Sequence, residues 1–138
     1  MDKQKIDKLE QKRQELLEQY RSVVKEIENE KINGVDFIGK FIIFDETRHL
    51  YVRDQMVFDE GVVLAGMFFD HNIGEQYLYV DDDYRCNFSV DNFIDFIENK
   101  NYKEITQEEF ISDYMDAYEE VERFPKILVN KLVNKNSK

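Results

Sequence analysis

Acidic side chains cluster at two places in the middle of the chain, in a pattern that could bind a hard cation. Asp70-His71 stands in one polar stretch, and Asp81-Asp82-Asp83 forms another. Mg²⁺ and Ca²⁺ bind clustered carboxylates, but these stretches lack the alternating acids, central glycine and closing glutamate of an EF-hand loop. The pattern predicts solvated turns with no metal ion and no other cofactor. A weak cation site would need the two turns to meet at one end of the fold.

Other side chains that carry out chemistry are few. Histidine occurs only at His49 and His71, and cysteine only at Cys86, so a structural zinc site cannot be completed. Cys86 alternates with Arg85 in a predicted strand, and we expect it to face the core rather than act as a nucleophile. No glycine-rich phosphate loop, GxSxG elbow or HExxH helix is present. We therefore expect no catalytic residues and no enzymatic activity.

A run of acids in the last third of the chain has the spacing of a helix surface. Residues 108–122 carry seven acidic side chains and no basic one. Like charges three or four residues apart repel each other on a helix, so this array either keeps the protein soluble or serves a partner. An array of this kind resembles the phosphates of a nucleic acid. The predicted partner-binding residues are Asp81, Asp82, Asp83, Asp113, Asp116, Glu119 and Glu120.

The net charge of −11 is divided unevenly along the chain. Residues 1–34 are neutral, residues 35–124 carry −15, and residues 125–138 carry +4. We interpret these parts as an oligomerisation helix, an acidic domain and a basic tail that clasps acidic surface within or between copies. So concentrated a negative field disfavours nucleic acids and anionic membranes as partners. It favours a basic protein, such as a nucleic-acid-binding enzyme.

The first segment has the pattern of a coiled coil. Residues 2–30 contain neither Gly nor Pro, and the seam residues are spaced alternately by three and four. Leu17 and Val24 add a second apolar stripe. The pattern predicts self-association through a helix that ends at Asn33-Gly34, with Arg13 fixing the register; the alternative is a helix packed on its own domain. The predicted oligomerisation residues are Ile6, Leu9, Arg13, Leu16, Tyr20, Val23 and Ile27.

The middle of the chain changes to short β-rich runs separated by turn residues. We predict strands over residues 37–44, 49–58, 62–69, 76–80 and 84–88, with Asp81-Asp82-Asp83 as a turn. The connections are too short for crossover helices, so the sheet must be antiparallel. The expected fold class is α+β, with a five-stranded SH3-like barrel or strongly bent sheet.

Two to three helices are expected after the sheet. Ser89 or Asp91 caps a short helix, and Thr106-Gln107-Glu108-Glu109 is a capping box that opens a longer one. Pro125 is expected to end that helix at Phe124, because proline lacks the amide hydrogen that helix bonding needs. A short basic amphipathic stretch would follow.

The order of these parts resembles that of small accessory proteins of bacteriophages and mobile elements in AT-rich bacteria. The local match is the phrase Tyr102-Lys103-Glu104-Ile105-Thr106-Gln107-Glu108-Glu109-Phe110, and the abundance of Lys, Asn, Asp and Ile is similar. The resemblance implies an inhibitor of a host defence protein, acting in the bacterial cytoplasm. It carries over no functional residue.

The sequence thus predicts a non-enzymatic acidic binding protein that occupies a basic nucleic-acid-binding surface of a bacterial protein. The alternative is an assembly protein whose acidity serves solubility. A single cysteine allows no intrachain disulfide, and no apolar run nears the ~20 residues of a membrane span, so we expect a cytoplasmic protein. A minor alternative is a sink for a small anionic ligand, formed by Tyr51, Tyr77, Tyr79 and Arg53 or Arg85.

Overall fold

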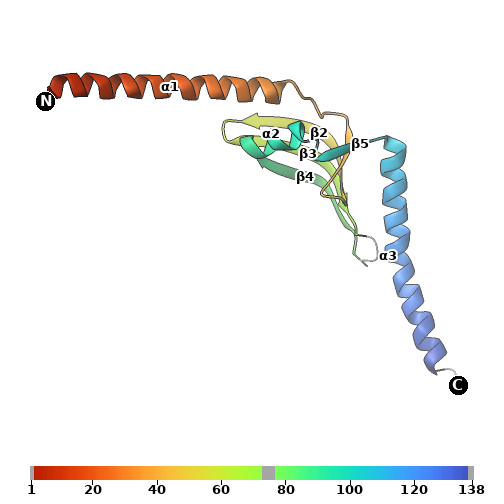
Figure 1. Cartoon of the computed structure of the whole chain (residues 1–138). Coiled ribbons are helices and arrows are strands. Elements are labelled where there is room, and N and C mark those ends of the chain that lie inside the picture. The colour runs from red at the N-terminus through yellow and green to blue at the C-terminus, as the bar shows by residue number, and fades with distance from the viewer. Residues whose placement is uncertain (1, 73–76, 137–138) are drawn as a thin grey trace. The chain divides into compact units, whose positions relative to one another are not determined.

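The computed structural model describes residues 2–72 and 77–136, with the backbone alone for residues 124–128 and 134–136. The chain forms two compact units, Met1–Asp36 and Phe37–Lys138. The predicted α+β class is confirmed: a long N-terminal helix precedes a five-stranded antiparallel sheet and further helices (Figure 1).

The first unit is the helix α1 (Lys3–Asn33). Asp2 caps its N-terminus by accepting hydrogen bonds from the backbone amides of Gln4 and Lys5. The helix ends at Asn33, as the sequence predicts, and the amide of Gly34 donates to the Glu30 carbonyl. Gly34 has a φ of −74°, so the helix ends without a left-handed residue.

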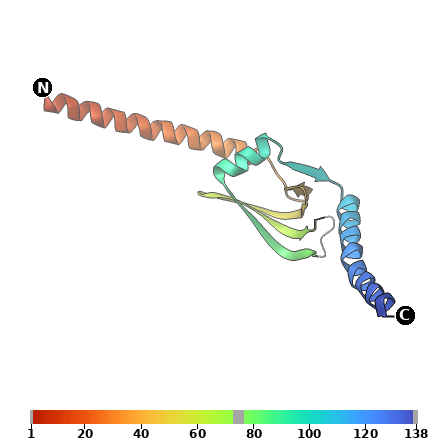
Figure 2. The same ribbon diagram turned by 60° about the horizontal axis from the view of Figure 1, so that its bottom comes forward.

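The second unit is built on an antiparallel sheet in the order β4-β3-β2-β1-β5. The sheet is open, with β4 and β5 at its edges, and its long strands curve together (Figure 2). It therefore has the bent form rather than the closed form of the two predicted shapes. Its strands are β1 (Phe41–Phe44), β2 (Arg48–Phe58), β3 (Gly61–Asp70), β4 (Tyr79–Ser89) and β5 (Tyr102–Ile105).

Three predicted strand boundaries are wrong. The first strand was expected over residues 37–44, but β1 begins only at Phe41. The expected turn at Asp81-Asp82-Asp83 lies inside the single strand β4, where the register with β3 shifts between Gly66 and Phe68. A bulge absorbs one extra residue in an antiparallel pair, so a strand can pass through residues that disfavour it. The fifth strand is β5, a short segment that pairs with β1 and that we expected to be a connection between helices.

One face of the sheet packs against the short helix α2 (Val90–Glu98). Ser89 caps this helix, as the sequence allows, by accepting from the Asn92 amide. Phe93 and Phe96 are buried, and Phe96 lies 6.2 Å from Phe44, centroid to centroid. Residues paired across neighbouring strands share a face, so this layer also includes Ile42, Leu50 and Phe68.

The opposite face packs against the first half of α3 (Gln107–Asn136). Phe110 is buried, and its ring lies 5.1 Å from both Phe41 on β1 and Phe69 on β3. Tyr114, one turn further on, lies 5.4 Å from Phe69. Ile105 completes this second cluster. The sheet is therefore a platform that holds the start of α3 in a fixed place.

The helix α3 does not end before Pro125, contrary to prediction, but continues as one α-helix to Asn136. A proline inside a helix removes one hydrogen bond and costs about 3 kcal/mol, which kinks or weakens a helix without always ending it. Good helix formers on both sides keep the backbone helical. Because residues 126–135 extend the same helix, they cannot fold back on the acids of residues 108–122. The expected clasp of the tail on that acidic helix is therefore wrong within one chain.

Within residues 2–72 and 77–136, the structure contains no helix with the length and apolar character that crossing a bilayer requires.

Candidate functional site

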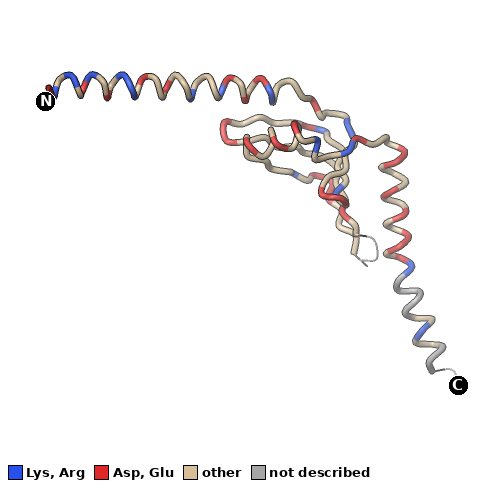
Figure 3. The backbone as a smooth tube through the Cα atoms, in the orientation of Figure 1, with Lys and Arg blue, Asp and Glu red and all other residues tan. Residues whose placement is uncertain are grey.

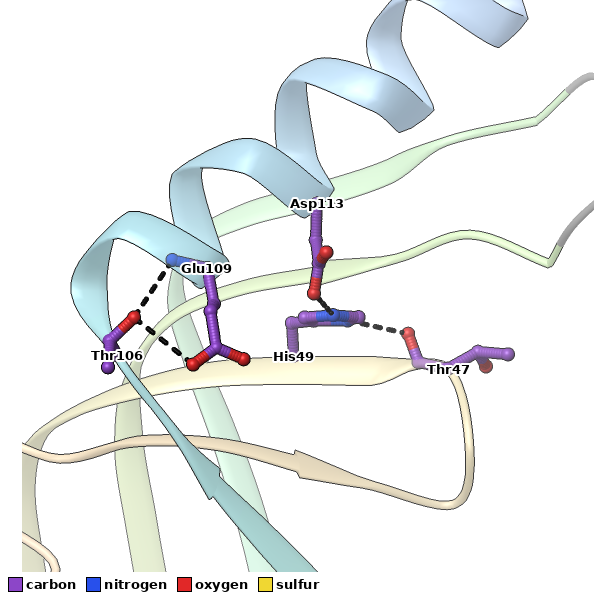
Figure 4. A network of polar contacts seen from close by, with 5 residues as sticks. All are labelled: Thr47, His49, Thr106, Glu109 and Asp113. Atoms are coloured by element: carbon purple, nitrogen blue, oxygen red, sulfur yellow. Dashed lines mark hydrogen bonds and ion pairs between the residues drawn. The ribbon is translucent and has the colours of Figure 1, made fainter.

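The acidic helix begins at the predicted capping box. The Thr106 hydroxyl oxygen accepts from the Glu109 amide at 3.1 Å, and the same hydroxyl donates to the Glu109 carboxylate at 3.3 Å (Figure 4). This cap satisfies backbone amides that a helix start leaves without a partner. The cap fixes where α3 begins, and buried Phe110 fixes which side of the helix faces the sheet. The two together determine the directions in which the acidic side chains of α3 point.

His49 on β2 joins this helix to the sheet. Its Nδ1 lies 3.0 Å from the carbonyl oxygen of Thr47, and its Nε2 lies 2.9 Å from Oδ2 of Asp113 on α3 (Figure 4). The ring stacks on Phe69 with centroids 4.2 Å apart, and its side chain is only 11% exposed. A polar bridge is thus built into the aromatic layer beneath α3.

His71 forms a second bridge of the same kind, just beyond the end of β3. Its Nδ1 lies 2.9 Å from the Tyr77 carbonyl oxygen, and its Nε2 lies 3.1 Å from Oε2 of Glu120. The side chain of His71 is 5% exposed. Asp113 and Glu120 are seven residues apart, which is about two helical turns, so they point to the same side of α3.

Both bridges place an imidazole between two hydrogen-bond acceptors. A neutral imidazole donates from one nitrogen and accepts at the other, whereas an imidazolium donates from both. A carbonyl and a carboxylate can only accept. Each histidine therefore makes its two hydrogen bonds together only when its ring is protonated, and each bridge is then an ion pair across the sheet–helix boundary.

A hollow of about 260 Å³ lies between the two bridges. Its titratable lining side chains are Glu46, His49, His71, Asp113, Asp116 and Glu120. The lining contains no lysine and no arginine, so the hollow attracts cations and repels anions. Among the side chains that the structure describes, no group of three or more His, Cys, Asp or Glu is placed to hold a metal ion.

An apolar groove of about 300 Å³ lies on the sheet beside α3. Met67, Val80 and Ile111 line it and are each at least two-fifths exposed. The acids Asp113, Asp116 and Glu120 lie on a different side of α3, around the hollow. A surface that contacts α3 along its length would meet charge on one side of the helix and apolar groups on the other.

The four predicted acids of α3 have two different roles. Asp113 and Glu120 belong to the histidine bridges and are 42% and 39% exposed. Asp116 and Glu119 are exposed, and Asp116 also lines the hollow. The structure thus brings Asp113, Asp116 and Glu120 together at one site, with Glu119 on the outer side of the same helix.

The other predicted acids lie away from this site, on the edge strand β4. The Asp81 carboxylate accepts from the Asp83 amide at 2.9 Å and from the Tyr79 hydroxyl at 3.2 Å. Asp82 pairs with Arg53 at 3.5 Å. Charged residues on an edge strand prevent unwanted pairing with other strands, and the three aspartates are such residues on β4. Their predicted role in binding a partner stays a prediction.

Cys86 on β4 is half-buried, and the structure records it as a free thiol. Burial raises the pKa of this thiol from its ordinary value of 9.0 to about 11, although Arg48 lowers it in part. A thiol with such a pKa is almost fully protonated near neutral pH, and only the thiolate is a good nucleophile.

The side chains predicted for the minor alternative, a sink for a small anionic ligand, do not converge on one site. Tyr51 stacks on Phe41 beneath α3, with centroids 4.5 Å apart. Tyr79 and Arg53 contact Asp81 and Asp82 on the edge strand. The open sheet has no barrel end at which these groups would converge.

The predicted seam of α1 lies on one helix and is exposed. Its six apolar members are between 38% and 68% exposed. Val24 of the second stripe is half-buried.

The two histidine bridges are the functional feature that sequence reasoning missed. The signal for them is present but weak. Asp113 and Glu120 follow Phe110 at helical spacings, and His49 is paired with Phe69 in the antiparallel register. His71 follows Phe69 by two residues, and alternation along a strand places such residues on one face. Only the pairing of β2 with β3 brings the two histidines beneath one helix.

Comparisons with protein-family models, with curated proteins and with solved structures gave no match.

Proposed function

We propose that this chain is a non-enzymatic binding protein whose acidic helix α3 occupies the basic nucleic-acid-binding surface of another protein. The observation that carries this proposal is the charge density of α3. Seven acids fall within residues 108–122, which span about 22 Å of helix at 1.5 Å per residue, and five of them lie outside the histidine bridges. These five give about one negative charge per 4.4 Å, of the same order as the one per ~3.4 Å of a DNA strand.

The placement of α3 also supports this function. Its first half is fixed on the sheet by Phe110 and by the two bridges, so binding requires little ordering of the helix. Figure 3 shows the acids following one another along this half, ahead of the first basic residue. The neighbouring apolar groove offers a place for an apolar side chain within a charged rim, as protein interfaces usually have.

Asp116 and Glu119 provide the cleanest test, because no histidine bridge depends on them. A tagged full-length chain would be used to recover proteins from a nuclease-treated bacterial lysate, and each recovered protein would be assayed for DNA binding. We expect wild type to compete with DNA for that protein and to lose affinity as salt rises. Asp116→Asn with Glu119→Gln should weaken the competition about tenfold, since each exposed charge pair contributes up to about 1 kcal/mol.

Glu15→Gln with Glu18→Gln is the matched control. It removes two exposed acids at the same spacing from α1, and it should leave the competition unchanged. Equal competition by wild type and by the α3 variant would contradict the proposal, as would recovery of partners that do not bind nucleic acid.

The exposed seam of α1 favours a second function, assembly of an oligomer in which the acidity serves solubility. In that case the purified protein self-associates, and the α3 substitutions affect no partner. The two functions are compatible, because the seam and the acidic helix lie on different units.

The proposed partner is a bacterial protein, such as a defence nuclease, if the chain acts as phage accessory proteins do. We place this activity in the cytoplasm, which is in keeping with a lone free cysteine.

A further inference from the structure

The helix α1 presents a continuous apolar seam with no cover in its own unit. Leu9, Leu16 and Tyr20 are each more than half exposed along a helix of 31 residues. A long helix in water gains most of its stability by packing an apolar face against another element. The seam therefore calls for a partner helix, and the charges of α1 decide which one.

Parallel pairing of two copies of α1 is unfavourable at its centre. Arg13 occupies a core position of the heptad, and Lys12 flanks it. In register, Arg13 meets Arg13 of the second copy, and the two Lys12 side chains flank this layer, so four positive charges lie at about the same level of the coil. The attraction of Lys5 for Glu10 of the second copy, near the helix start, does not relieve that crowding.

Antiparallel pairing removes this conflict. When the helices cross between Gln14 and Glu15, residues 12 and 13 lie opposite residues 16 and 17 of the second copy. Lys12 and Arg13 then lie beside the segment that carries Glu15 and Glu18. The core layers of this alignment are Ile6 with Val23, Leu9 with Tyr20, and Arg13 with Leu16.

The rest of the chain favours the same orientation. Residues 1–34 are neutral, and residues 35–138 carry the whole net charge of −11. That charge follows the C-terminal end of α1. Parallel helices bring two such ends together, whereas antiparallel helices in this alignment separate them by about 55 Å, several Debye lengths at physiological salt.

We propose that α1 pairs in antiparallel orientation with α1 of a second copy of this chain. The pair of helices joins the acidic units of two chains in one dimer. This inference is independent of what the acidic units bind.

Cysteine cross-linking tests the orientation directly, because the chain has a single native cysteine. In full-length protein with Cys86→Ser, Ile6→Cys and Val23→Cys are made separately. We expect an unfolded and refolded mixture of the two variants to form a disulfide-linked dimer under mild oxidation, whereas each variant alone remains mostly monomeric in a denaturing gel. Efficient self-cross-linking of each variant alone would indicate parallel helices and overturn the proposal.

Light scattering on the uncross-linked protein tests the seam. Wild type should have twice the chain mass of 16.7 kDa. Leu9→Asp with Leu16→Asp should give the mass of a single chain, while Gln11→Asp with Gln14→Asp, which adds the same charge off the seam, should remain dimeric. A wild-type mass of one chain, or a dimer that survives the seam substitutions, would overturn the proposal. The near-ultraviolet circular dichroism of the sheet unit should be the same in all three proteins.

Discussion

The helices α1 and α3 are almost equal in length, at 31 and 30 residues, but they are held in different ways. The first half of α3 is fixed by a sheet that offers aromatic rings and two histidines. The seam of α1 has aliphatic groups, one tyrosine and one arginine, and these are exposed within its own unit. Both elements show helical periodicity, whereas the chemistry of the neighbouring sheet surface decides how the first half of α3 is held within its own unit.

The two helices also differ in how their charges are distributed. Bases and acids alternate along α1 and cancel, so this helix can lie close to a copy of itself. The acids of α3 are concentrated in its first half, ahead of Arg123, so two such halves repel each other. This difference is the basis for our proposals that α1 self-associates and that α3 binds a foreign, basic surface.

The largest expected effect comes from removing the apolar anchor of α3. Phe110→Ala should lower the free energy of unfolding of the sheet unit by about 3–5 kcal/mol, because a buried ring is replaced by a cavity. Leu16→Ala in α1 is the comparison, and it should leave that unit unchanged while weakening self-association. Urea unfolding followed by tyrosine fluorescence measures the first quantity. Similar losses from both substitutions would contradict the distinction between the helices.

Pro125 divides the docked half of α3 from the rest. Pro125→Ala should stabilise the helix around this position by about 3 kcal/mol, which slows the exchange of nearby amide hydrogens about a hundredfold. Gln14→Ala in α1, where no proline interrupts the helix, should change exchange only slightly. Hydrogen exchange measured by NMR distinguishes the two. Unchanged exchange around residue 125 would mean that the proline does not weaken α3.

Breaking the bridge from His49 to Asp113 should have a smaller effect on stability. Asp113→Asn should lower stability by about 1 kcal/mol at pH 5.5, because it removes a charged hydrogen bond from a side chain that is 42% exposed. Asp116→Asn, in the same hollow but outside the bridge, is the matched control and should leave stability unchanged.

Nitrogen chemical shifts of the two histidines check the same bridges without reference to stability. Where the bridges are formed, both ring nitrogens of His49 and His71 should show the shifts of nitrogens that donate a hydrogen bond. A neutral tautomer at either position would mean that the ring makes only one of its two hydrogen bonds.

The sequence predicted the features that depend on local signals. Spacings of a few residues predict the seam of α1, the end of this helix at Asn33, the capping box at Thr106 and the antiparallel sheet. The strand β5 was missed because Tyr102 and Ile105 enclose two charged residues, and this short segment becomes a strand only by pairing with β1, about sixty residues earlier. The sequence predicts a turn at Asp81-Asp82-Asp83 because aspartate is unfavourable in a regular strand. The strand β4 nevertheless continues through these residues, because a bulge tolerates them.

The sequence predicts only part of the candidate site, because the rest depends on contacts between residues that are far apart in the chain. The acids of α3 are visible in the sequence, and their spacing places them on a helix. Their division into bridge residues and exposed residues depends on His49 and His71, which lie 64 and 49 residues from their carboxylate partners. No local sequence pattern links groups so far apart. An acidic array can therefore be proposed as a binding surface only after the acids that pair with histidines of the same chain have been identified.

The last prediction concerns Cys86, which lies in the sheet unit alone and affects stability only at alkaline pH. Its thiol has a pKa of about 11 in the folded chain and 9.0 ordinarily, so between these values the unfolded chain loses a proton that the folded chain keeps. The folded state then binds more protons, and stability falls as the pH rises from about 9 to about 11. Burial also raises the pKa of Tyr84 on the same strand, so Cys86→Ala should reduce this alkaline loss without abolishing it. Urea unfolding of wild type and variant at pH 8 and pH 10.5 measures the difference. Light scattering at each pH should show the same self-association for wild type and variant, because α1 contains no cysteine. Equal alkaline losses in wild type and variant would mean that the thiol is not shielded by the sheet.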